Sequence, residues 1–150
     1  MIQRIHISST GELDDIPAIS DLVDSYCRLH RIPEQIGFHL RLALDELLTN
    51  TVSYGFSQDS RRRTIEIRVQ LLPAWLITEV QDNGSPFNPL EAPAPDLLAS
   101  VETRAIGGLG IHLVRSVIDQ LDYRHQDNCN ILQLRQALPT TEGGDGNFPR

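Results

Sequence analysis

Residues 43–56 read ALDELLTNTVSYGF, and the rest of this 150-residue chain is interpreted outward from them. They belong to a predicted helix that begins near Pro33 and runs to about residue 54, stopping at Gly55, because proline suits the first turn of a helix and glycine its end. Apolar residues recur along one stripe of this helix, at about 100° per residue: Ile36, Leu40, Ala43, Leu44 and Leu47. This stripe is expected to face a sheet.

Two polar residues lie at the margin of the stripe. Glu46 and Asn50 are four positions apart, so their side chains lie one above the other, whereas Asp45 points nearer to solvent. One interpretation is a surface pair joined by an i,i+4 hydrogen bond. The other is the wall of a binding site, in which the Asn50 oxygen binds Mg²⁺ and Glu46 accepts a proton. Mg²⁺ takes a few hard oxygen ligands together with phosphates and water, so one Asn is enough.

A second motif, Asp82-Asn83-Gly84, follows a strand predicted over residues 74–81. A carboxylate held at a strand end can accept a hydrogen bond from an exocyclic amine, such as N6 of adenine. Gly84 would let the backbone come close to a flat base, because it has no side chain. An ordinary turn is the alternative interpretation.

A third motif is rich in glycine and precedes a predicted helix. Gly107, Gly108 and Gly110 remove side chains from a turn, and the helix that follows presents free amides and a partial positive charge, which suit phosphate. Arg104 and Arg115 are candidate partners for a phosphate. The alternatives are an ordinary glycine-rich entry to a helix and, for Arg115, a solvated helix residue.

The composition excludes several classes of function. All 13 basic residues are Arg, and the lack of Lys excludes a Walker-type phosphate-binding Lys, a Schiff-base Lys and the strand Lys of eukaryotic-type protein kinases. The formal net charge of −7 argues against a general nucleic-acid binder. No apolar run is long enough to span a membrane, and the N-terminus lacks the apolar centre of a signal peptide. We therefore expect a cytoplasmic protein with no membrane or direct nucleic-acid partner.

Hydrophobic periodicity divides the chain into elements. Alternation predicts strands over residues 2–8, 63–72, 74–81, 121–125 and 130–136, the last two joined by a turn at 126–128. Helical spacing predicts helices over residues 12–30, 33–54 and 110–121. In the first helix the apolar residues are Ile16, Ile19, Leu22, Val23, Tyr26 and Leu29. Prolines and weak periodicity predict a long loop, or lid, over about residues 85–106.

These elements predict the architecture. Helices and antiparallel strands occur in separate groups, which indicates an α+β fold: a two-layer α/β sandwich with a mixed, mostly antiparallel sheet and helices on one face. The length favours one domain over residues 1–138. Residues 139–150 are polar and rich in glycine, which predicts a mobile tail.

The three motifs, taken in order, resemble a known family. ELLTN (46–50), DNG (82–84) and GGLGI (107–111) are similar to the N, G1 and G2 boxes of the ATPase superfamily shared by histidine kinases, type II gyrases and MutL. DNGSPFNPL and IGGLGIHLVRSVID resemble one branch of it, the anti-sigma-factor serine/threonine kinases of bacterial partner-switching systems. The resemblance runs from the first predicted helix to the last hairpin. It implies a Bergerat-type ATP-binding fold.

The resemblance implies roles for the first two motifs. Glu46 would be the general base and Asn50 the Mg²⁺ ligand. Asp82 would recognise adenine, and Gly84 would give the base room.

It also implies how the phosphates of ATP are held. Gly107, Gly108, Leu109 and Gly110 would wrap the phosphates under a mobile lid. The lid here is long, contains proline and has no Lys, so Arg104 is the residue expected to meet the γ-phosphate.

An activity and partners follow from the same resemblance. The expected reaction is phosphorylation of a Ser or Thr on an anti-sigma factor antagonist with a STAS fold, with ATP as donor and Mg²⁺ as cofactor. A sigma factor, held in the other state of the switch, and a second copy of the chain, forming a homodimer, are compatible with it. Two other functions stay open: a non-catalytic ATP-dependent partner-binding module, and a detached histidine-kinase catalytic domain.

Overall fold

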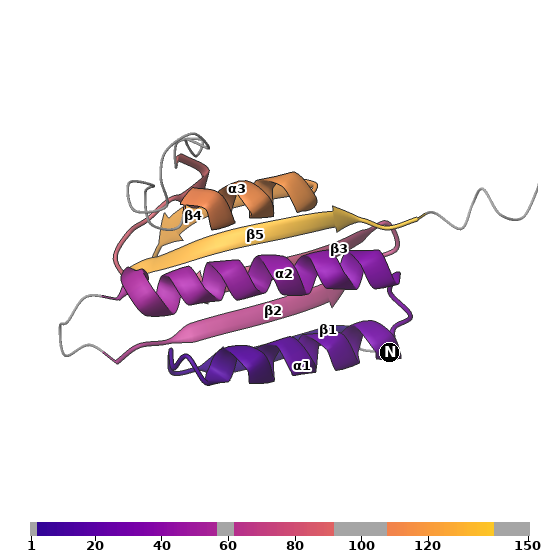
Figure 1. The fold of residues 1–150 in the computed structure, drawn as a ribbon, viewed down its shortest axis with the longest axis horizontal. Helices are drawn as coiled ribbons and strands as arrows, with labels where there is room; N and C mark the ends of the chain where they lie inside the picture. Colours follow the sequence, from indigo (N-terminus) through magenta and orange to yellow (C-terminus); the bar gives the residue numbers. More distant parts are fainter. Residues whose placement is uncertain (1–2, 57–61, 92–107, 140–150) are drawn as a thin grey trace, which may run out of the picture.

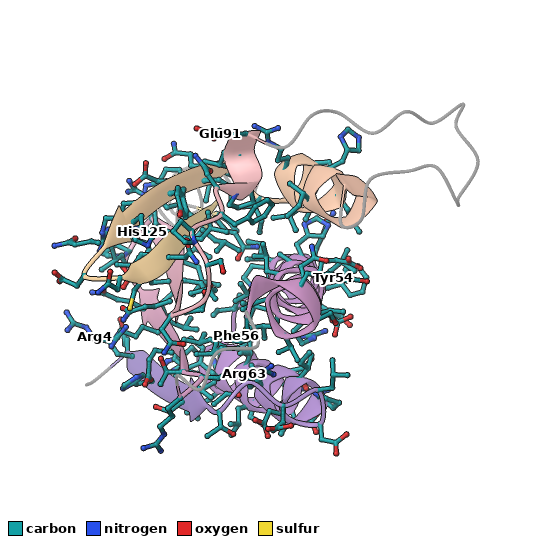
Figure 2. The ribbon with its side chains drawn as sticks, turned by 90° about the vertical axis from the view of Figure 1, so that its left-hand side faces the viewer. Arg4, Tyr54, Phe56, Arg63, Glu91 and His125 are labelled. Carbon is teal, nitrogen blue, oxygen red and sulfur yellow. The ribbon has the colours of Figure 1, made fainter. Side chains whose placement is uncertain are left out.

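A sheet and three helices form two layers in the part of the chain that the computed structural model describes, residues 3–56, 62–91 and 108–139. The strands are β1 (Arg4–Ser9), β2 (Ile65–Leu71), β3 (Trp75–Asp82), β4 (Gln120–Gln126) and β5 (Cys129–Ala137). The helices are α1 (Asp15–Leu29), α2 (Glu34–Asn50) and α3 (Gly108–Val117), with a π-helical turn η1 (Thr51–Gly55) and a 3₁₀ turn η2 (Pro89–Glu91). The helices all cover the same face of the sheet (Figures 1 and 2), which confirms the predicted α+β two-layer fold.

The strand order is β1-β2-β3-β5-β4, and every neighbouring pair is antiparallel. The described strands therefore form an antiparallel sheet, where a mixed and mostly antiparallel one was expected. β5 lies beside β3 although α3 and β4 separate them in the sequence (Figure 1). In this pairing Asp82 lies opposite Asn130.

Strict alternation along β3 places two polar residues, Thr78 and Asp82, on the helix-covered face together with apolar ones. Leu76, Thr78, Val80 and Asp82 are buried, and the residues between them are partly exposed. Successive side chains of a strand point to opposite faces. Asp82 is thus turned inward by the same alternation that buries Val80.

The core lies between this face and the helices. The stripe predicted for α2 is confirmed: Leu40, Ala43, Leu44 and Leu47 are buried and Ile36 packs against the core. The helix predicted over residues 12–30 is confirmed as α1, but not all of its apolar residues are buried: Leu22 is 53% and Leu29 76% exposed. Helical spacing defines a stripe wider than the sheet can cover, and the sheet ends at the edge strand β1.

Two predicted helix ends differ from the structure. The helix predicted to stop at Gly55 is regular only to Asn50, and Thr51–Gly55 continue it as the π-helical turn. The helix predicted over residues 110–121 begins at Gly108 and ends at Val117. The last two residues of the predicted helix, 120 and 121, instead belong to β4, where Gln120 pairs with Arg135. Strand pairing here overrides local helical spacing.

The C-terminal hairpin is confirmed, with a tighter turn than predicted. β4 extends to Gln126, so only Asp127 and Asn128 form the turn. Both have positive φ, 54° and 61°. Two such residues match a type I′ turn, whose twist suits a two-residue hairpin.

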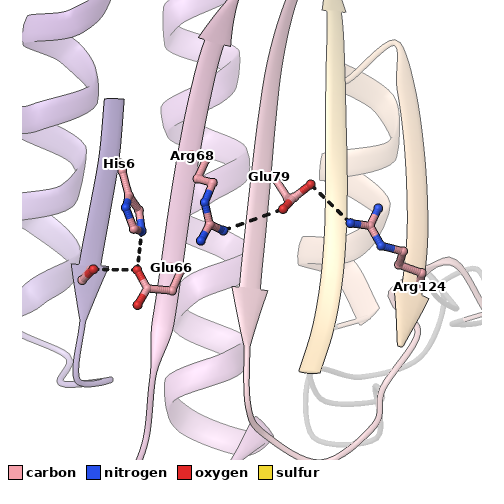
Figure 3. Close-up of polar contacts among 6 residues, drawn as sticks. His6, Glu66, Arg68, Glu79 and Arg124 are labelled. Atoms are coloured by element: carbon pink, nitrogen blue, oxygen red, sulfur yellow. Dashed lines mark hydrogen bonds and ion pairs between the residues drawn. The ribbon is translucent and has the colours of Figure 1, made fainter. Parts of the chain in front are cut away.

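The other face of the sheet is polar (Figure 3). Glu79 on β3 lies between Arg68 on β2, at 3.8 Å, and Arg124 on β4, at 3.7 Å, and His6 on β1 contacts Glu66 on β2. An antiparallel sheet with one solvated face carries such alternation of apolar and polar residues. These exposed pairs add little stability, about 0–1 kcal/mol each.

Most of the predicted lid, with Arg104 and Gly107, and the predicted tail from residue 140 onward lie outside the described residues. Within the described ranges, no helix is both long and apolar enough to cross a membrane.

A pair of leucine substitutions tests the assignment of the core. Leu40→Ala removes a side chain that is 0% exposed and should lower the free energy of unfolding by about 2–5 kcal/mol. Leu22→Ala, at the 53% exposed position, should change it by no more than about 0.5 kcal/mol. Chemical denaturation monitored by circular dichroism measures both. A loss of more than about 2 kcal/mol for Leu22→Ala would contradict the exposed position.

Candidate functional site

Asp82 ends β3 inside the two-layer structure, at 9% exposure. Its Oδ1 accepts hydrogen bonds from the Gly84 backbone N–H at 2.9 Å and from Asn130 Nδ2 at 3.0 Å. Burial raises the pKa of this carboxyl; the two hydrogen bonds and the charge of His125 act against that rise. The site thus holds a desolvated carboxylate at a fixed place, as recognition of a base amine requires.

Asn130 is the polar residue of this region that the sequence interpretation missed. It starts the buried face of β5 at 7% exposure and lies opposite Asp82. A signal was present, because Asn130 is a polar residue on the alternating face that carries Leu132 and Leu134. Only the strand register, however, connects it with Asp82.

Gly84 contacts the end of the π-helical turn. A Cβ built at Gly84 would lie 2.5 Å from the Gly55 carbonyl oxygen, and the next residue, Ser85, donates its backbone N–H to that oxygen at 2.9 Å. At the same end, the Arg63 guanidinium lies 5.1 Å from the centre of the Phe56 ring (Figure 2). The described neighbours thus explain why a glycine is needed at position 84 for packing alone, independently of any room for a base.

Glu46 and Asn50 lie on α2 as the helical spacing predicted. Both are half-buried and Asp45 is exposed. Among the described residues no hydrogen bond joins Glu46 to Asn50, so the surface-pair interpretation lacks the contact that would define it. Of the two, Glu46 has its carboxylate beside Gly110 of α3.

Gly110 brings α3 against Glu46. A Cβ built at Gly110 would overlap Oε2 of Glu46 and lie 3.2 Å from its Cδ. The carboxylate therefore lies against the first turn of α3, which Gly108, Leu109 and Gly110 form. The turn that carries the third motif and the helix that carries the first are in direct contact.

The two arginine candidates have different outcomes. Arg115 donates from Nη2 to the Leu90 carbonyl oxygen at 2.6 Å, which ties α3 to η2. This exposed side chain is thus anchored to a backbone carbonyl in the described contacts, and its role as a phosphate partner stays a prediction. Arg104 and Gly107 lie outside the described residues.

These features fit ATP with Mg²⁺. Gly110 lies in the first turn of α3, beside the Glu46 carboxylate, and the backbone amides of a helix start suit phosphate. The described residues contain no group of three or more His, Cys, Asp or Glu that could hold a metal. A cation there would take most of its ligands from phosphate and water, which Mg²⁺ accepts with one protein oxygen such as that of Asn50.

Comparison with known proteins gives the class to which this fold and site belong. Residues 10–136 match the family model of the histidine kinase-like ATPase domain. The chain belongs to this family, as the three motifs predicted.

Within the family, the chain is similar to bacterial proteins named serine or serine/threonine protein kinases. The serine/threonine-protein kinase BtrW of Bordetella bronchiseptica is 30% identical over 100 residues, which cover 67% of this chain and 70% of BtrW. The serine-protein kinase RsbW of Bacillus mycoides is 25% identical over 117 residues, which cover 72% of this chain and 69% of RsbW. The predicted resemblance to the anti-sigma-factor kinase branch is confirmed.

Solved structures support the fold. The RsbU and RsbW domains of a Mycobacterium tuberculosis protein superpose with a TM-score of 0.65 at 12% identity, covering 91% of this chain. The histidine kinase domain of a blue-light activated histidine kinase from Erythrobacter litoralis superposes with a TM-score of 0.54 at 15% identity. This chain spans 33% of the first of those chains and 59% of the second.

Two glycine substitutions should have opposite effects on stability. At Gly84 a Cβ meets the backbone of Gly55, which cannot turn away, so Gly84→Ala should cost about 1–3 kcal/mol. At Gly110 the Cβ meets the end of the Glu46 side chain, which can rotate, and alanine favours a helix by up to about 1 kcal/mol. Gly110→Ala should therefore melt no lower than the parent while displacing Glu46. Thermal unfolding measures both; equal losses would contradict the two contacts.

The raised pKa of Asp82 makes a prediction about stability. Since its folded-state pKa lies above the unfolded value of about 3.9, the folded protein binds the proton more tightly, and this carboxyl lowers stability as pH rises through that window. Asp82→Asn keeps an oxygen acceptor for Gly84 and Asn130. It should melt at the same or a higher temperature than the parent at neutral pH, with the gain shrinking as pH falls toward about 4.

Thermal unfolding across this pH range measures the effect. The matched control is Asp122→Asn, at an exposed position on β4, which should leave the melting temperature unchanged. A large loss for Asp82→Asn at neutral pH would show that the hydrogen bonds to the carboxylate outweigh its desolvation.

Proposed function

We propose that this protein is an ATP-dependent serine/threonine kinase of the partner-switching type, with a STAS-fold anti-sigma factor antagonist as its substrate. The observation that carries the proposal is the contact of Gly110 with the Glu46 carboxylate. It brings a candidate proton acceptor to the helix start that suits the phosphates of ATP. The relatives named serine-protein kinases support a hydroxyl acceptor rather than histidine.

Different residues of the site bind different parts of ATP. At one end Asp82 accepts a hydrogen bond from the exocyclic amine of adenine. At the other, the backbone amides of the first turn of α3 bind phosphate oxygens, and Arg104 meets the γ-phosphate. Asn50 would hold Mg²⁺ through its amide oxygen, and the metal, when bound, would neutralise charge on the phosphates.

Glu46 acts on the acceptor. It takes the proton from the substrate Ser or Thr hydroxyl as the oxygen bonds to the γ-phosphorus, and ADP leaves with the electron pair of the broken bond. Phosphoryl transfer needs mainly positioning and charge stabilisation, so a single base with oriented amides is sufficient.

Partner choice is the proposed output. The unphosphorylated antagonist is the substrate, and the kinase in its other state holds a sigma factor or a comparable effector. The decisive experiment incubates the purified protein and its cognate antagonist with Mg²⁺ and ATP labelled at the γ-phosphate. Labelled phosphoserine or phosphothreonine on the antagonist supports the proposal; nucleotide-dependent binding without transfer would favour the binding-module function.

Substitution of Glu46 separates the base from the binding residues. Glu46→Gln keeps the size and hydrogen-bonding capacity of the side chain, so ATP and the antagonist should still bind. Loss of a general base costs about 10²–10⁴-fold in rate, and we expect phosphate transfer to slow by that amount. Single-turnover transfer measures the rate, and calorimetry measures ATP affinity.

Two other positions on the same helix serve as controls. Asp45→Asn, at an exposed position, should change neither rate nor affinity. Asn50→Ala should weaken the Mg²⁺-dependent part of ATP binding. Transfer by Glu46→Gln at the parent rate would remove Glu46 as the base.

A further inference from the structure

The side-chain amide of Asn130 connects three segments at the end of β3. Its Nδ2 donates to Asp82 Oδ1 at 3.0 Å and to the Ser85 carbonyl oxygen at 2.9 Å. Its Oδ1 accepts the backbone N–H of Phe87 at 3.1 Å and the hydroxyl of Tyr123. One buried amide thus joins the carboxylate, the segment that follows it and the last hairpin.

These contacts leave the amide one orientation. Each Nδ2 partner is an acceptor and each Oδ1 partner is a donor. A flipped amide would place its oxygen against a carboxylate and a carbonyl, and its NH₂ against an N–H. Buried groups without partners cost about 1–3 kcal/mol each, so the flipped form is strongly disfavoured.

The contacts also distinguish the two oxygens of Asp82. Among the described residues, Oδ1 takes the hydrogen bonds from Gly84 and Asn130, and no bond to Oδ2 is found. Turning the carboxylate out of this orientation would break both bonds, whereas a half-turn only exchanges two equivalent oxygens. The two donors therefore fix the plane of the carboxylate and leave its second oxygen without a described hydrogen bond.

We propose that Asn130 is a positioning and specificity residue: it fixes the orientation of the Asp82 carboxylate so that its second oxygen is available to the adenine amine, and it ties residues 84–87 to that orientation. The proposal rests on the adenine role proposed for Asp82. It gives the last hairpin a part in nucleotide selection, through Tyr123 on β4, without direct contact with ATP.

The charges and hydrogen bonds around Asp82 predict how removal of Asn130 should change the pKa of Asp82. Among the described residues, two titratable groups from β4 interact with the charge of Asp82: Tyr123, and His125, whose charge lowers the pKa of Asp82. Asn130 also lowers it by donating to the carboxylate, against burial. Removal of Asn130 should therefore raise the pKa of Asp82 further. The ionised form that accepts the adenine amine would then be lost at a higher pH.

The test compares Asn130→Ala with Gln136→Ala. Gln136 is a matched control, because it is a buried amide on the same strand and face, and its Nε2 donates to the Ile36 carbonyl oxygen at 3.0 Å. Both variants lose a buried amide and should melt lower. Only Asn130→Ala should also weaken ATP binding, by about ten- to hundredfold. In this variant alone, the preference for ATP over GTP should fall. The loss of ATP binding on acidification should also begin at a higher pH than in the parent.

Two further measurements keep the outcome decisive. The pKa of Asp82, followed by carboxyl-carbon NMR in the nucleotide-free protein, should rise in Asn130→Ala and stay at the parent value in Gln136→Ala. Tyr123→Phe removes one bond to Asn130 Oδ1 and should weaken ATP binding in the same direction, by less than tenfold, even if Asn130→Ala does not fold.

The outcomes separate the two proposals. An unchanged Asp82 pKa and an unchanged ATP-to-GTP preference in Asn130→Ala, or in Tyr123→Phe where the first variant does not fold, would overturn the role of Asn130. A parent protein that binds no ATP would overturn the proposed function instead, while the NMR titration would still decide whether Asn130 positions Asp82.

Discussion

The pairing of β5 with β3 is the constraint on which the rest of the structure depends. β5 follows β3 only after α3 and β4, so its insertion between β3 and the edge strand β4 places α3 beside α2 on the covered face. The same pairing sets Asp82 opposite Asn130. The two ends of the site, one at β3 and one at the start of α3, are thus fixed by one long-range contact.

Keeping the buried Asp82 carboxylate ionised lowers the stability of the folded protein. A buried carboxylate is unfavourable unless polar partners compensate for lost water, and here a backbone N–H and the amide of Asn130 supply part of that compensation. The pKa of Asp82 stays raised, so the compensation is incomplete. Proteins commonly retain such local destabilisation where a group must serve a ligand rather than the fold.

Glycine plays two different physical parts in the same site. At Gly84 the missing side chain allows two backbone segments to meet, because the Gly55 carbonyl fills the space. At Gly110 it allows a helix start to meet a carboxylate, whose side chain can move. The first glycine serves the packing of two backbone segments, and the second lets a carboxylate approach the start of a helix.

The sequence by itself determined the type and order of nearly all elements, the stripe of α2 and the three motifs, because these depend on local periodicity and on residues close in the chain. Tertiary structure decided the rest. The exposed Leu22 and Leu29 depend on where the sheet ends, and the early end of α3 depends on pairing with β5. Asn130 becomes part of the site only through strand register, which relates residues 48 positions apart, and the local alternation that marks Asn130 as buried does not connect it with Asp82.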